Sequence, residues 1–159
     1  METFQDANGC VVELSFKNNS FSESTEHVLV ICTFYNQWLL TKHKIRGFEF
    51  PGGKREEGET LEKAAIREVY EETGAVLETI QYIGEYKVSN EQDSFVKAIF
   101  YGEVESLQQK EHYFETQGPV LVGGDLLSLR WQDSYSYIMK DNVIEKAIQK
   151  INEKKKRLP

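Results

Sequence analysis

Blocks of apolar residues separated by polar, turn-forming stretches run along the chain and predict strands before and after a central helix. The strongest block is 27–34, where four consecutive apolar residues, Val28 to Ile31, predict a strand buried on both faces. Weaker or alternating blocks predict further strands over 10–16, 38–42, 48–50, 80–88, 95–104 and 126–131. The stretch 110–124, which contains two glycine turns, is predicted to be irregular.

Apolar residues at helical spacing predict two helices. One is expected over 60–73, with Thr60 as its N-cap and Gly74 in the left-handed stop position. The other runs from a cap at Asp141 to about residue 154. This order predicts an α/β (α+β) fold, a mixed sheet packed between helices. A chain of 159 residues without a linker or repeat is expected to form one domain, 1–159.

Composition and charge narrow the class of protein. The 40% hydrophobic and 12% aromatic content is typical of a globular protein rather than a disordered one. The net charge of −7 argues against broad electrostatic binding to nucleic acid, and therefore against duplex DNA, although local cations could still bind an anionic ligand. No apolar run approaches 18 residues and the N-terminus is polar, so we expect no membrane segment and a cytoplasmic location. Cys10 and Cys32 are predicted to be buried free thiols, and Trp38 and Trp131 to be core residues.

The stretch 53–75 concentrates negative charge on one side of the predicted helix. Glu68, Glu71 and Glu72 are spaced i, i+3 and i+4, so their carboxylates share one face. Each like-charged pair costs about 3 kcal/mol at a separation of about 6 Å and an effective dielectric constant of about 20. Such crowding predicts a bound cation. Carboxylate and backbone oxygens without histidine or cysteine favour Mg²⁺, with Mn²⁺ as a substitute, over zinc.

The same stretch resembles the signature of a known family. Its fixed positions are Gly53, Glu59, Arg67, Glu68, Val69, Glu71, Glu72, Gly74 and the weaker hydrophobic position Ala75. They match the Nudix box throughout. Apart from the hydrophobic residues Val69 and Ala75, these are seven identities, which at about 7% each would occur by chance in about one register in 10⁸, so the resemblance is specific. The phrases at 49–54, 113–116, 118–120 and 138–141 are also similar to bacillar MutT-like enzymes described as 8-oxo-dGTP diphosphatases and as RNA pyrophosphohydrolases.

The resemblance implies roles for individual residues. The carboxylates of Glu68, Glu71 and Glu72 would bind metal, and the carbonyl oxygen at Gly52 would complete the metal shell. Arg67, which can also reach Glu71 at i+4, would orient the acidic edge. The general base would be Glu68 or a later glutamate, for which Glu115 is the candidate.

Substrate contacts are predicted outside the box. The resemblance implies that Glu49 and Phe50 line the nucleotide pocket, although Glu49 could equally be a core hydrogen-bond partner. Lys42 and Arg46 belong to a basic loop that either contacts substrate phosphates or is simply surface.

The expected activity is Mg²⁺-dependent hydrolysis of a nucleoside triphosphate to a monophosphate and pyrophosphate by metal-assisted attack of water. An oxidised purine nucleotide such as 8-oxo-dGTP is the first expectation. RNA 5′ ends, ADP-ribose and dinucleoside polyphosphates are the alternatives, and a Nudix domain that only binds nucleotides or protein partners is a further one. A non-catalytic domain would usually lack some of the box glutamates, and this chain keeps all of them.

Overall fold

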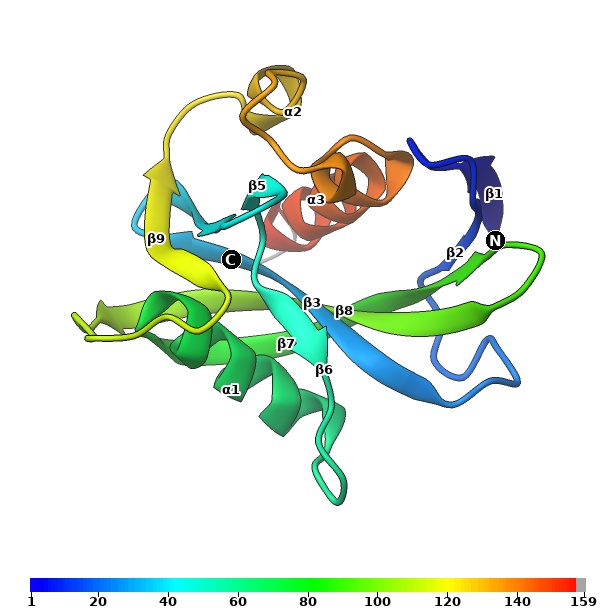
Figure 1. The fold of residues 1–159 in the computed structure, drawn as a ribbon, viewed down its shortest axis with the longest axis horizontal. Coiled ribbons are helices and arrows are strands. Elements are labelled where there is room, and N and C mark those ends of the chain that lie inside the picture. Colours follow the sequence, from blue (N-terminus) through cyan, green and yellow to red (C-terminus); the bar gives the residue numbers. More distant parts are fainter. Residues whose placement is uncertain (157–159) are drawn as a thin grey trace.

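A nine-stranded mixed sheet forms the centre of the molecule in a computed structural model that describes residues 1–156 (Figure 1). The strands are β1 (Glu2–Gln5), β2 (Val11–Ser15), β3 (Thr25–Phe34), β4 (Gln37–His43), β5 (Gly47–Glu49), β6 (Gly52–Lys54), β7 (Ala75–Ser89), β8 (Ser94–Leu107) and β9 (Thr116–Val122). Their order is β1-β2-β7-β8-β3-β4-β5, with β6 beside β3 and β9 beside β4. Strands β3 and β8 are parallel and the other pairs are antiparallel, which makes the sheet mixed as predicted.

The helices are α1 (Leu61–Thr73), α2 (Leu126–Leu129) and α3 (Asn142–Lys156), with a 3₁₀ turn, η1 (Tyr137–Met139). Figure 1 shows α1 and α3 on opposite sides of the sheet. Among residues 1–156, no helix is long and apolar enough to span a membrane. Residues 157–159 complete the predicted domain and lie outside the described part of the chain.

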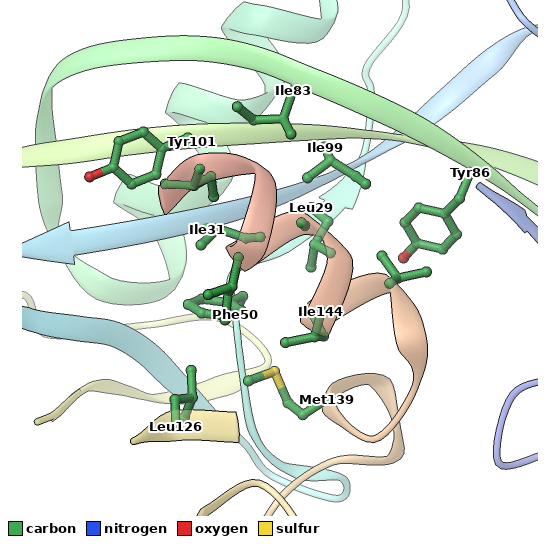
Figure 2. Packing of buried hydrophobic residues seen from close by; sticks show 14 of the residues in the cluster. Leu29, Ile31, Phe50, Ile83, Tyr86, Ile99, Tyr101, Leu126, Met139 and Ile144 are labelled. Carbon is green, nitrogen blue, oxygen red and sulfur yellow. The ribbon is translucent and has the colours of Figure 1, made fainter. Parts of the chain in front are cut away.

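Strand β3 is buried on both faces, as its continuous apolar run predicts. Val28 and Val30 pack towards α1 in one cluster, whereas Leu29 and Ile31 pack towards α3 in the other. Figure 2 shows the second cluster, in which Leu29 and Ile31 lie near Ile144 of α3 and near Phe50. Because successive side chains of a strand point to opposite faces, one strand supplies both cores. The result is a sandwich of helix, sheet and helix.

Helix α1 begins and ends where the sequence predicts. The Thr60 hydroxyl oxygen accepts a hydrogen bond from Lys63 N at 3.1 Å. Gly74 has φ +78° and donates its N–H to Tyr70 O. A Cβ on Gly74 would lie 2.0 Å from Gln108 O, so this position needs glycine for its left-handed backbone and for close packing. At the other end of the chain, Asp141 Oδ1 accepts from Val143 N at 2.9 Å, which confirms the predicted cap of α3.

Three parts of the secondary-structure prediction are wrong. The stretch 126–131 is not a strand, because Asp125 O accepts from Leu129 N and starts the short helix α2. The supposedly irregular stretch 110–124 contains β9, which pairs with β4; Pro119, which has no N–H to donate, lies within it. The N-terminal strand β1 was not expected, since its short polar sequence has no strand pattern of its own and the strand forms by pairing with β2.

Two side chains also differ from the predictions. Trp131 is 58% exposed rather than in the core, and the Arg130 guanidinium stacks on its ring at 4.5 Å. Arg130 is the buried partner of this pair, because it donates to the carbonyl oxygens of Met139 and Asp141. Cys32 is a buried free thiol as predicted, whereas Cys10 is free but only half-buried.

Candidate active site

The acidic edge of α1 faces a cavity of about 360 Å³. The cavity is lined by His43, Arg46, Gly52, Gly53, Lys54, Glu56, Arg67, Glu68, Glu71, Glu72, Phe114 and Glu115. All of the residues predicted to act in catalysis or metal binding therefore lie around one space, although they come from α1, β6 and a distant loop. The connection between β4 and β5 contributes Arg46, and the segment before β9 contributes Glu115. We refer to this space as the carboxylate cavity.

Arg67 connects the predicted glutamates of the box. Its Nε and Nη2 donate to the two carboxylate oxygens of Glu59 at 2.8 and 2.9 Å. Its Nη1 donates to Glu68 Oε1 at 3.0 Å and to Glu71 Oε2 at 3.2 Å, the second being the predicted i+4 contact. The guanidinium also donates to Lys54 O at 3.1 Å, so it joins the helix to the loop that precedes it. A planar group with five donors suits this arrangement, whereas lysine could not hold all these oxygens in one orientation.

Glu72 is the most buried carboxylate of the edge. Burial is the main cause that raises its pKa to about 9, and the nearby carboxylate of Glu68 adds to this effect. The backbone N–H of Gly52 donates to Glu72 Oε1 at 3.1 Å and opposes the rise. Burial likewise raises the pKa of Glu68, although its ion pair with Arg67 works against the shift.

The neighbouring glycine leaves room for Glu68. A Cβ on Gly53 would lie 2.5 Å from the carboxyl carbon of Glu68, so a larger residue here would displace this carboxylate from its position beside Arg67. The two glycines of β6 therefore have two effects on the edge: the N–H of Gly52 binds Glu72, and the missing side chain of Gly53 accommodates Glu68.

The donor set fits a hard divalent cation. Within the described residues no three acidic, histidine or cysteine side chains already converge on a point, because Arg67 holds Glu68 and Glu71 by its own hydrogen bonds. Burial raises the pKa of Glu68 and Glu72, and repulsion from the neighbouring carboxylates adds to it, so a bound cation would stabilise their charged forms. Carboxylate oxygens are the ligands that Mg²⁺ and Mn²⁺ prefer, and the site has no thiolate.

Hydroxyl groups from two strands hold the end of α1 in place. Thr116 Oγ1 donates to the main-chain carbonyl oxygen of Glu72 at 2.9 Å, and Thr41 Oγ1 approaches the same oxygen at 3.2 Å. The carbonyl oxygens of Tyr70 and Glu71 each accept from Lys110 Nζ at 3.1 Å. The last carbonyls of a helix lack the usual partner four residues on, so these contacts supply partners beyond the bond from Gly74 N to Tyr70 O and fix the acidic edge relative to β4 and β9.

We expect Thr116→Val to destabilise the protein by about 1 to 3 kcal/mol, since the change removes a buried hydrogen bond without altering side-chain volume. The substitution also removes the acceptor that Thr116 Oγ1 offers to Gly118 N. Urea unfolding would measure the loss. Thr79→Val, at an exposed position of β7, is the matched control and should change the unfolding free energy by less than about 0.5 kcal/mol. Equal effects of the two changes would contradict the anchoring role of Thr116.

A second pocket, of about 250 Å³, adjoins the carboxylate cavity and shares Arg46, Gly52 and Gly53 with it. Glu49 and Phe50 line this pocket, as predicted for a nucleotide site. The Glu49 carboxylate is buried and accepts from Arg46 Nη2 at 2.7 Å and from Nε at 3.1 Å. Lys42 lines neither space and its Nζ lies 5.9 Å from the Phe48 ring centroid, so its phosphate contact stays a prediction.

Two residues of the second pocket were missed by the sequence analysis. Burial lowers the pKa of Lys97, and within the described residues no carboxylate lies within 4.0 Å of its amino group. His27 Nδ1 is buried without a hydrogen-bond partner in the described structure, and its ring packs against Phe95 at 5.1 Å. Both residues lie within strands and have no neighbouring motif, so only the pairing of β3 with β8, which sets His27 opposite Lys97, identifies them.

In this helix–sheet–helix sandwich, helix α1 presents to a cavity several glutamates and the arginine that binds them. This combination defines a class of acid-anhydride hydrolases. A family model, the NUDIX domain, matches residues 22–134, and the chain belongs to the Nudix family of hydrolases. It is a Nudix pyrophosphohydrolase, and members of this family typically use divalent metal.

Individual proteins that are similar to this chain indicate which members of the family it resembles. A protein of Bacillus subtilis, "Putative 8-oxo-dGTP diphosphatase YtkD", is 45% identical over 153 residues, covering 96% of this chain and 97% of that protein. The crystal structure of the B. subtilis pyrophosphohydrolase BsRppH, as an E68A mutant, has a TM-score of 0.93 and 44% identity, covering 97% of this chain and 98% of that one. A Nudix hydrolase from Nitrosomonas europaea, with a TM-score of 0.66 and 18% identity over 82% of this chain and 90% of its own, shares the fold.

Proposed function

We propose that the chain hydrolyses a nucleoside triphosphate, such as 8-oxo-dGTP or a related (d)NTP, to the monophosphate and pyrophosphate. The observation that supports this most directly is that the two spaces adjoin each other. A pocket of about 250 Å³ with polar and apolar walls shares Arg46, Gly52 and Gly53 with the carboxylate cavity. A base in the first space would place its phosphates in the second. We take residues 1–159 as one domain, since both apolar cores pack on a single sheet.

In this proposal Glu68, Glu71 and Glu72, with the carbonyl of Gly52, hold Mg²⁺ or Mn²⁺. When bound, the cation supplies charge compensation for the phosphates and lowers the pKa of water. Arg67 keeps the Glu68 and Glu71 side chains in fixed rotamers before the substrate arrives. Glu68 or Glu115 accepts the proton of the attacking water, because both carboxylates line the cavity.

Lys97 and Arg46 carry hydrogen-bond donors that suit a nucleobase with acceptor atoms on its edge. Lys97 lines the pocket, and no carboxylate among residues 1–156 pairs with its amino group, so a bound carbonyl oxygen or ring nitrogen could accept from it. A purine with an O6 oxygen, as in guanine and 8-oxoguanine nucleotides, offers such an acceptor. The name of the relative YtkD supports the same substrate class.

Hydrolysis at the 5′ end of triphosphorylated RNA is the second candidate. It is supported by the similarity to the pyrophosphohydrolase BsRppH and by an open rim, where the Glu115 side chain is 88% exposed. An RNA 5′ end could therefore enter the site while the rest of the chain stays in solvent. The net charge of −7 makes extensive contact with a long RNA unfavourable, so recognition would be confined to the end.

The test is a parallel turnover series with dGTP, 8-oxo-dGTP, other NTPs, triphosphorylated RNA and ADP-ribose, ranked by kcat/KM in Mg²⁺ and in Mn²⁺. We expect release of pyrophosphate from a purine triphosphate and no turnover in EDTA. The highest kcat/KM on triphosphorylated RNA would favour the second candidate. Absence of turnover on every substrate with either metal would contradict an enzymatic role.

We expect Lys97→Met to raise KM by about 10- to 100-fold with a smaller change in kcat, since a hydrogen bond to a charged group contributes about 1.5 to 3 kcal/mol. Methionine keeps the length of the side chain and removes the charge. Steady-state kinetics on the best substrate of the series would measure the split. Lys17→Met, at an exposed position, is the control. A fall in kcat at unchanged KM would contradict a base-binding role for Lys97.

A further inference from the structure

His43 is a buried residue at the wall of the carboxylate cavity that the proposed chemistry has not used. It is the last residue of β4 and lies opposite Thr116 of β9 in the strand pairing. The neighbouring backbone links the same two segments, because Lys44 N donates to Glu115 O at 3.3 Å. His43 and Glu115 are therefore held beside each other by the sheet, although 72 positions separate them in the sequence.

The backbone around His43 selects one tautomer of its ring. Nδ1 accepts hydrogen bonds from Ile45 N at 3.2 Å and from Arg46 N at 3.1 Å. A nitrogen that accepts two N–H groups carries no hydrogen, so the ring hydrogen is on Nε2. His43 Nε2 lies 4.0 Å from Glu115 Oε2, and the imidazole side chain is 10% exposed while the carboxylate is 88% exposed. A buried donor thus faces an exposed acceptor.

We propose that His43 is a positioning residue whose Nε2–H orients the Glu115 carboxylate over the carboxylate cavity. The 4.0 Å separation is longer than a hydrogen bond, and a rotation of the exposed Glu115 side chain would close it. Thr41 and Thr116, on the same two strands, both bond the main-chain oxygen of Glu72, so the donor has a fixed position relative to the acidic edge. This inference rests on the proposed function, in which Glu115 acts in the reaction.

Two substitutions at His43 separate its two nitrogens. Asn places an oxygen near the Nδ1 position, so His43→Asn keeps the acceptor for the backbone of the 44–46 loop and removes the donor. Gln places an amide nitrogen near the Nε2 position, so His43→Gln keeps a donor towards Glu115. We expect the Asn variant to lose about 10- to 100-fold in kcat at nearly unchanged KM, because misplacement of a catalytic group has effects of this size. The Gln variant should recover a large part of this loss.

A double-mutant cycle with Glu115→Gln tests whether His43 affects kcat through Glu115. If His43 acts through Glu115, His43→Asn should lower kcat by less than about 2-fold once Glu115 is already Gln. Full additivity of the two losses would overturn the proposal, as would wild-type kcat in His43→Asn. His112→Ala, at an exposed position of the loop that precedes β9, is the control.

The tautomer of His43 can be tested without any substitution, and single variants separate this inference from the proposed function. NMR of the wild-type imidazole should show the hydrogen on Nε2, and a hydrogen on Nδ1 would overturn the assignment. Wild-type kcat in Glu115→Gln together with an inactive Glu68→Gln would overturn this inference alone. An active Glu68→Gln would instead contradict the proposed catalytic role of Glu68.

Discussion

Replacing Glu68 by Gln is expected to lower kcat by about 10²- to 10⁴-fold while the protein stays folded. Glu68 faces the carboxylate cavity and is held by Arg67 Nη1 at 3.0 Å. Glutamine has the same shape but has neither the charge that would bind a cation nor the basicity to accept a proton. The loss should therefore appear in kcat and in the Mg²⁺ concentration needed for half-maximal rate, rather than in the secondary structure.

The control for this change lies in the same stretch of sequence. Glu57→Gln alters an exposed loop residue that lies outside both spaces, so kcat should stay within about 2-fold of the wild type. Steady-state rates over a Mg²⁺ series, with circular dichroism of each variant, would measure both. Wild-type kcat in the Glu68 variant would contradict its proposed role in catalysis.

Replacing Glu72 by Gln is expected to stabilise the metal-free protein above neutral pH and to abolish activity. The pKa of Glu72 is raised to about 9, whereas the unfolded chain has the ordinary value of 4.5. The folded state therefore keeps a proton that the unfolded state releases. The stability that this proton provides is complete below about pH 4.5 and is lost as the pH rises towards 9, by at most about 1.4 kcal/mol for each pH unit.

Glutamine carries no such proton, and its amide oxygen can still accept from Gly52 N. In EDTA the wild type should melt at a lower temperature at pH 8 than at pH 5.5, and the Glu72→Gln variant should show a smaller difference. A stabilisation of 1 kcal/mol corresponds to about 2 to 4 °C for a protein of this size. Glu91→Gln, in an exposed turn, is the control.

Added Mg²⁺ gives an independent test of the same residue. If Glu72 binds the cation, Mg²⁺ should raise the melting temperature of the wild type at pH 8 and leave that of the variant nearly unchanged. Equal stabilisation of both proteins by Mg²⁺ would contradict a ligand role for Glu72. A lower stability of the variant in EDTA at pH 8 would contradict the effect of burying its charge.

Local patterns predicted the parts of the fold that depend on neighbouring residues. The cap at Thr60, the stop at Gly74 and the double burial of β3 follow from spacing within a single element, and the structure confirms them. Strand β9 and helix α2 were mispredicted for the opposite reason. Strand β9 depends on its pairing with β4, and the leucine-rich stretch of α2 is too short for periodicity to distinguish a helix from a strand.

The sequence by itself determined the family and the placement of three glutamates on one side of α1, because i, i+3 and i+4 spacing is a property of any helix. The tertiary structure alone decided how those glutamates are held. The Thr116 contact with Glu72, the approach of Gly53 to Glu68 and the pairing of His43 with Glu115 join residues that are 15 to 72 positions apart. Such contacts depend on how the sheet brings distant segments together, and no local spacing along the chain specifies them.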